Sequence, residues 1–175
     1  MATELQFIKS ASYGYDDTGT STFSITDCFN DTYEVFFVIV TMGQSGGAAS
    51  DMNMRLLDSS DTEISTANYD YAGLVMNTGS VFSENRNTGQ TSFIGIAGLT
   101  GRTSTNSSSS VNFYVYNPIS SSYTFVQGQG MENTSRGNKY IGVLDLTTSC
   151  TGMKFIPNNV SATIRQITVS VYGVK

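Results

Sequence analysis

The sequence predicts an all-β protein, an antiparallel β-sandwich of jelly-roll-like type with about ten strands. Three observations lead to this prediction. The 175 residues are rich in Gly, Ser, Thr and Asn, include 10 Tyr and 10 Phe, and are only 13% charged, a composition typical of strands and turns. Short strand-like segments separated by turn residues recur at roughly ten-residue spacing. No segment longer than one turn repeats apolar residues at the helical period.

The length predicts a single domain, residues 1–175. In its first half the expected strands are residues 6–9, 20–27, 33–42, 52–57, 63–66, 69–76, 80–82 and 92–97. The strongest is YEVFFVIVTM at 33–42, because it is rich in Val, Ile and Phe and too short to span a membrane. Residues 52–57 alternate apolar and polar side chains, and a turn at residues 58–61 is expected to return the chain.

The second half begins with a polar, Ser-rich segment, residues 101–110, which we expect to be an exposed loop. The expected strands that follow are residues 111–117, 123–127, 140–146, 153–156 and 164–174. Pro118 and Pro157 end two of them, because proline cannot donate to a strand ladder. The Gly- and Asn-rich residues 128–138 are expected to connect two strands. Ile164 is out of phase with the alternation that follows, which predicts a bulge near Arg165 or a strand beginning at Gln166.

Several function classes are excluded by what the sequence lacks. There is no His, so a Ser-His-Asp or Cys-His catalytic device is excluded. The net charge is −5 and the 9 Lys and Arg residues are scattered, which argues against binding to nucleic acid. No apolar run approaches the ~20 residues of a membrane span, and we expect no signal peptide. The absence of Trp argues against an immunoglobulin core, so the jelly roll is favoured.

The residues that could carry chemistry have simpler interpretations. Cys28 and Cys150 are expected to be reduced, partly buried thiols, although the sequence leaves a disulfide open. Asp58, Asp61 and Glu63 could surround a calcium ion, but acidic and Ser residues are also usual in β-turns. We therefore expect no metal, no cofactor and no enzymatic activity, including hydrolysis of glycosides by paired carboxylates.

A candidate interface comes from the strand at residues 33–42, because both of its faces are apolar. Such a strand is either central and covered on both sides by the same chain, or part of a subunit interface. Tyr114 and Tyr116 alternate with the apolar residues of their strand and raise the same question, since Tyr is enriched at interfaces. The candidate interface residues are Phe36, Val38, Val40, Tyr114 and Tyr116.

The sequence resembles the small all-β structural proteins of tailed bacteriophages, especially those of marine and cyanobacterial phages. The resemblance covers nearly the whole chain as a pattern of strands and composition. Its clearest points are the opening MATELQFIKS, the early strand YEVFFVIV, the late FYVYNP and the terminal ITVSVYGVK. Members of this group often end in a strand finishing with Tyr-Gly and an aliphatic residue, as residues 172–174 do here.

The resemblance implies a non-enzymatic virion structural protein made in the host cytoplasm. Within that class a capsid decoration or cement protein on the outer head surface is favoured, because the chain has no shaft or repeat of the kind fibres need. The implied partners are sister copies, with a homotrimer favoured, and the major capsid protein or other virion proteins. The alternative is a fibre or knob module that binds a receptor or a surface carbohydrate, with the Tyr rings as a platform.

Overall fold

The structure, a computed structural model, describes residues 4–14, 18–43, 45–79, 82–103, 108–132 and 136–175. These residues form fourteen strands and one short 3-10 helix, with no α-helix among them. Ten of the strands are eight or nine residues long. All pairings between strands are antiparallel. The prediction of an antiparallel, jelly-roll-like sandwich with about ten strands is therefore confirmed.

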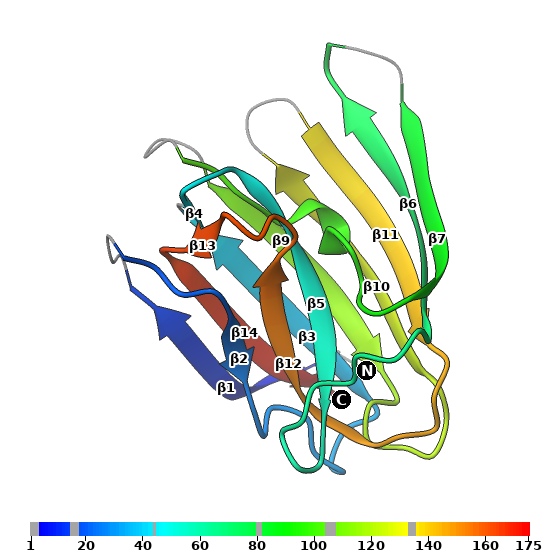
Figure 1. Ribbon diagram of the computed structural model, residues 1–175. Helices are drawn as coiled ribbons and strands as arrows, with labels where there is room; N and C mark the ends of the chain where they lie inside the picture. The colour runs from blue at the N-terminus through cyan, green and yellow to red at the C-terminus, as the bar shows by residue number, and fades with distance from the viewer. Residues whose placement is uncertain (1–3, 15–17, 44, 80–81, 104–107, 133–135) are drawn as a thin grey trace.

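One layer of the sandwich is an eight-stranded sheet with the order β1-β14-β3-β9-β10-β11-β6-β7. In that order its strands are Leu5–Tyr13, Ile167–Val174, Val35–Met42, Ser109–Tyr116, Thr124–Glu132, Arg136–Leu144, Tyr69–Asn77 and Ser83–Gln90. We call it the large sheet. Its two edges are β1 and β7, which lie on opposite sides of the molecule (Figure 1).

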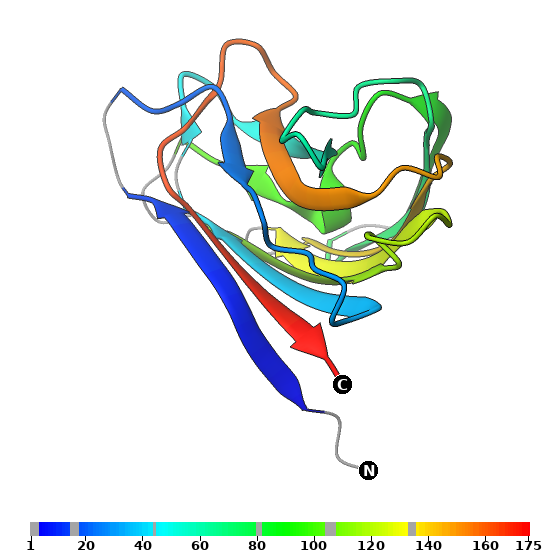
Figure 2. The same cartoon turned by 90° about the horizontal axis from the view of Figure 1, so that it is seen from below.

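The other layer is a four-stranded sheet with the order β2-β12-β5-β8. Its strands are Phe23–Ile25, Cys150–Pro157, Ser50–Asp58 and Thr100–Gly101. A further pair, β4 (Ser45–Gly46) and β13 (Thr163–Ile164), and the 3-10 helix η1 (Ile96–Gly98) complete the fold. Viewed from below, β12 lies across the core from β3 and β14 (Figure 2). Beyond the small sheet, η1 contacts β9, β10 and β11 and covers that part of the large sheet.

The core lies between the two layers and is supplied by alternate residues of most of the strands. In β3 the inward residues Phe36, Val38, Val40 and Met42 have no exposed surface. They face equally buried side chains of the small sheet such as Met54. Because successive side chains of a strand point to opposite faces, the period of two in the sequence translates directly into this core.

Four segments differ from the sequence-based expectation. Residues 63–66 form no strand, and only Glu63 makes an isolated bridge, to Leu57. The wholly polar segment SENRNTGQ forms β7, which pairs with β6; an edge strand exposed on both faces needs no apolar pattern. Residues 92–97 form no strand, because Phe93 makes only an isolated bridge to Met54 before η1 begins. The Gly-rich residues 128–138 lie largely in β10 and β11 rather than in a connection.

The glycines of β10 explain why that segment was misread. A Cβ at Gly128 would collide with the Cβ of Phe113, and one at Gly130 would collide with the backbone of Ala97. The two glycines therefore let the buried ring of Phe113 and the helix η1 pack directly onto the strand. Here glycine marks a close approach of neighbouring groups, not a turn.

The end of the chain agrees with the expected break in alternation. Ile164 belongs to the separate short strand β13, and β14 begins at Ile167. Two expected segments, the strand at residues 80–82 and the loop at residues 101–110, lie partly outside the described residues. None of the described residues forms a helix long and apolar enough to cross a membrane.

Candidate functional site

The outer face of the large sheet, turned away from the small sheet, carries an unusual set of aromatic side chains. The sequence-based proposal that Phe36, Val38 and Val40 form an interface is wrong, because all three are fully buried in the core. Their neighbours Val35, Phe37 and Ile39 are only half-buried and lie on the outer face instead. Both faces of β3 are apolar, but the residues named as the candidate interface lie on its inner face.

Cross-strand pairing brings the outer aromatic residues into one row. Phe7 pairs with Tyr172, Tyr172 with Phe37, and Phe37 with Tyr114. Ring centroids of Phe7 and Tyr172 are 5.7 Å apart, and those of Phe37 and Tyr114 are 5.0 Å apart, within the range of favourable aromatic pairs. The ring centroids of Tyr116 and Tyr114 are 6.1 Å apart, and Tyr116 pairs with Phe125 of β10. We call these six residues the aromatic belt: Phe7, Phe37, Tyr114, Tyr116, Phe125 and Tyr172.

Much of this face is open to solvent. The exposed fraction is 58% for Phe7, 38% for Tyr114, 45% for Phe125 and 58% for the neighbouring Ile141. Large apolar side chains this exposed, and adjacent to one another, are uncommon on a monomer surface. The structure thus brings the predicted Tyr114 and Tyr116 together with residues that the sequence analysis did not single out.

A cavity of about 850 Å³ continues the belt toward β6 and β7. Tyr116, Phe125, Ile141 and Val143 supply apolar walls, and the small side chain of Ala72, which pairs with both Ile141 and Arg86, leaves the hollow between them. We call this the outer cavity. Its volume is within the range of binding sites.

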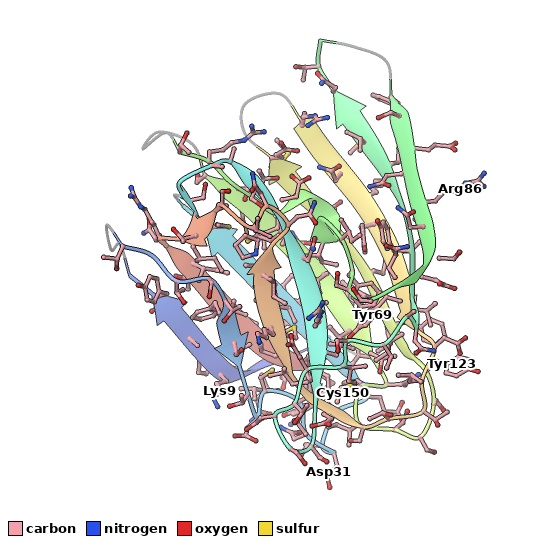
Figure 3. All side chains as sticks on the ribbon, in the orientation of Figure 1. Lys9, Asp31, Tyr69, Arg86, Tyr123 and Cys150 are labelled. Carbon is pink, nitrogen blue, oxygen red and sulfur yellow. The ribbon has the colours of Figure 1, made fainter. Side chains whose placement is uncertain are left out.

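Polar side chains also line the outer cavity. On its far side they are Asp70 of β6 and Arg86 and Thr88 of β7, while Gln127 of β10 lies on the side of the belt. Arg86 projects from the edge strand β7 (Figure 3). The Asp70 carboxylate accepts a hydrogen bond of 2.7 Å from the Gly89 N–H. The outer face therefore combines a broad apolar area with a narrow polar border, which is the usual anatomy of a protein–protein interface.

The acidic residues weighed as calcium ligands have structural roles. The Asp58 carboxylate accepts hydrogen bonds from the backbone N–H groups of Ser60 (2.8 Å) and Thr62 (3.0 Å), so it shapes the expected turn. The Glu63 carboxylate forms ion pairs with Arg55 at 3.0 Å and with Lys154 at 3.4 Å. Within the part of the chain that the structure describes, no three His, Cys, Asp or Glu side chains are grouped to hold a metal.

The same ion pairs determine the titration of Glu63. Partial burial by itself would raise the pKa of Glu63, but the hydrogen bond from Arg55 and the charges of Lys154 and Arg55 together lower it. Both cysteines are free and buried. Burial raises the pKa of Cys28 to about 12 and that of Cys150 to about 11, so neither thiol is a nucleophile near neutral pH.

Phe7, Phe125 and Ile141 were missed because nothing in the sequence gives the register between distant strands. Each residue belongs to a short segment whose alternation is visible, but the row exists only once β1, β14, β3, β9 and β10 are aligned. The one usable signal was the two-sided apolar pattern of residues 33–42, which implies cover on the outer face as well.

The sequence matches no protein-family model and no curated protein. Among solved structures, the chain is similar to domains LG4-5 of the mouse laminin alpha1 chain, with a TM-score of 0.35 and 12% identity over 97% of this chain and 45% of that one. It is also similar to the carbohydrate recognition domain of Emp47p, with a TM-score of 0.30 and 10% identity over 98% of this chain and 87% of that one. The third is peanut lectin, with a TM-score of 0.27 and 8% identity over 99% of this chain and 92% of that one. This chain thus spans less than half of the length of the solved laminin LG4-5 domains. Likeness at this level carries no information on binding or catalysis.

Proposed function

We propose that this protein is a non-enzymatic structural component of a bacteriophage particle, a decoration protein of the outer head surface. In this proposal neighbouring protein subunits cover the outer face of the large sheet. The sequence resemblance suggests the particle. The observation that carries the proposal in the molecule is the aromatic belt, because an apolar face of this extent is stabilised when another surface removes it from water.

The exposed area supports a specific interface. Six large apolar side chains on the outer face are about half exposed: Leu5, Phe7, Tyr114, Phe125, Met131 and Ile141. If each offers on the order of 100 Å², about half of the area of a large side chain, together they present roughly 600 Å². A standard interface buries about 800 Å² on each partner, so these residues supply most of what is required.

The chemistry of the face also suits a protein partner. Tyr and other aromatic residues are enriched in the centres of interfaces, where they are the residues whose truncation costs most. The outer cavity beside the belt can receive an apolar side chain of the partner. We propose sister copies as the first partner, with a trimer as the favoured assembly, and the major capsid protein as the surface on which that assembly sits.

The test of this function is the composition of purified phage particles. Mass spectrometry of particles made in the host should find the polypeptide at a fixed stoichiometry to the major capsid protein. Particles that lack the polypeptide, while the infected cell contains it, would end the proposal.

A second candidate function is a module that binds a receptor or a carbohydrate at the particle surface. The observation that favours it is the outer cavity, in which the rings of Tyr116 and Phe125 lie beside the polar side chains of Asp70, Arg86 and Gln127. A ring face can contact the apolar face of a sugar while polar groups bind its hydroxyls.

The two functions predict different results for the same variants. On a glycan array, a carbohydrate module should bind, and Tyr114→Ala or Tyr116→Ala should abolish the binding. A decoration protein should give no signal on the array, and the same changes should weaken its association with other virion subunits.

A further inference from the structure

A second cavity, of about 330 Å³, lies at an end of the sandwich rather than on the outer face. We call it the rim pocket and define it by Asp51, Thr100, Arg102, Glu132, Arg136 and Asn159. Asp51 lies in β5, Thr100 in β8, Glu132 at the end of β10 and Arg136 at the start of β11. The rim pocket therefore joins both layers of the sandwich. Within the described part of the chain, it shares no lining residue with the outer cavity.

Fixed hydrogen bonds hold the polar groups on one side of this pocket. The Thr100 hydroxyl donates to a carboxylate oxygen of Asp51 at 3.0 Å. The Ser50 hydroxyl donates to the Asp51 carbonyl at 2.9 Å and accepts from the Asn159 N–H at 2.9 Å. Thr100 and Ser50 are buried, so the position of Asp51 is determined by the surrounding structure before any ligand arrives.

Two arginines and one buried carboxylate form the other side. Glu132 is 6% exposed and is paired with both Arg102 and Arg136, the latter at 3.5 Å. Each guanidinium group carries five N–H donors, and the side chains of Arg102 and Arg136 are 32% and 45% exposed. Both arginines therefore keep donors for a ligand beyond those paired with Glu132.

The charges and the residue types indicate the class of ligand. Two arginines and the two carboxylates of Asp51 and Glu132 cancel, so the pocket does not select for an ion of either sign. It offers acceptors on Asp51 and donors on Arg102 and Arg136. A molecule with several neighbouring hydroxyl groups uses both kinds at once, because each hydroxyl donates one hydrogen bond and accepts others.

From these observations we infer that the rim pocket binds one neutral sugar unit through hydrogen bonds to Asp51, Arg102 and Arg136. The volume equals that of about ten water molecules, which leaves room for a single sugar ring. Among the residues that the structure describes, none that lines the pocket is aromatic, so binding is weak, with a dissociation constant on the order of millimolar. The inference does not depend on the aromatic belt or on the proposed assembly role.

The experiment is a titration of the ¹⁵N-labelled full chain, followed by amide chemical shifts. The probes are D-galactose, D-glucose and N-acetyl-D-glucosamine, with the charged sugars D-galacturonate and D-glucosamine for comparison. The amide chemical shifts of Asp51, Thr100 and Asn159 should change with sugar concentration until they reach a plateau. A neutral sugar should bind more tightly than either charged one.

Matched variants test the location. Asp51→Asn should weaken binding by about tenfold, since it removes a charged hydrogen-bond acceptor, whereas Asp70→Asn makes the same change in the outer cavity and should leave binding unchanged. Asp51 is exposed and its replacement is compatible with folding; Arg136→Lys, at a side chain 45% exposed, provides a second variant and should also weaken binding.

Three results would overturn the inference. One is the absence of saturable shifts at the rim pocket with all three neutral sugars. Another is an equal effect of Asp51→Asn and Asp70→Asn, or shifts centred on Tyr116 and Phe125, which would assign the sugar to the outer cavity. The third is tighter binding of a charged sugar than of its neutral counterpart.

Discussion

Replacing Tyr69 by Phe removes one oxygen atom from the core and tests how the small sheet is joined to the rest of the fold. The Tyr69 hydroxyl donates to the Ile64 carbonyl at 2.8 Å and accepts from the Leu56 N–H at 3.1 Å. It thereby connects β6 of the large sheet to β5 of the small sheet and to the segment that follows it. The ring is fully buried and packs edge-on against Phe93 at 4.8 Å, contacts that Phe retains.

The loss of stability follows from the two backbone groups left without a partner. Each buried, unsatisfied group costs about 1–3 kcal/mol, and the small void adds little, so Tyr69→Phe should lower the free energy of unfolding by about 2–6 kcal/mol. With a urea m-value of roughly 2 kcal/mol per molar, the unfolding midpoint should fall by about 1–3 M.

The matched control is Tyr71→Phe in the same strand. Tyr71 is also buried, but its hydroxyl accepts from a side chain, the amide of Asn87, at 2.8 Å, in a partly buried setting. Loss of this hydrogen bond should lower the free energy of unfolding by about 1 kcal/mol or less. Urea unfolding followed by circular dichroism measures both variants. If Tyr69→Phe proves no more destabilising than Tyr71→Phe, the argument from orphaned backbone groups is refuted.

Two further variants probe the outer face and the ion pairs, and a labelling experiment probes the buried thiols. Ile141→Asp should weaken association with other subunits by about seventyfold, since burying on the order of 100 Å² contributes about 2.5 kcal/mol. Sedimentation velocity should show no such effect for Val160→Asp, at a fully exposed position outside the large sheet. The pKa of Glu63 is lowered in the folded state, so its ionised form stabilises the fold above the unfolded pKa near 4.5 and this contribution is lost as the pH falls below that value. Glu63→Gln should therefore be less stable than the parent at pH 7 in thermal unfolding, with the difference vanishing in acid; a constant difference across the pH range contradicts this. Cys28 and Cys150 should not react with a disulfide reagent at pH 8 in the native protein and should both react in guanidinium chloride, because burial raises both thiol pKa values; rapid native labelling of either would argue against the packing described.

The alternation of side chains was enough to predict the layers of this fold but not how distant strands align. In β3, β9 and β14 the period of two is regular, and these strands form where expected. It failed at β7, whose residues are polar throughout, because an edge strand is held by backbone pairing with β6 and buries little. It also failed at Gly128, where glycine allows close packing against Phe113.

The outer face of the large sheet shows the same division. The two-sided apolar pattern of residues 33–42 predicted that both faces need cover, yet assigned the interface to Phe36, Val38 and Val40, which form the core. Deciding which face is inside requires knowing where the small sheet packs, and local sequence does not contain that information. Tyr114 lies on the outer face as expected, but its neighbour Phe37 belongs to a strand almost eighty residues earlier in the chain.

Covalent footprinting of the protein in free and particle-bound form tests the central claim most directly. A photoactivated carbene labels exposed side chains, and mass spectrometry then reads the extent of labelling residue by residue. Phe7, Tyr114 and Phe125 should lose most of their labelling when the protein is bound in purified phage particles, while Val160 keeps its own. Equal labelling of all four residues in the two forms would mean that no subunit covers the aromatic belt, and would contradict the account.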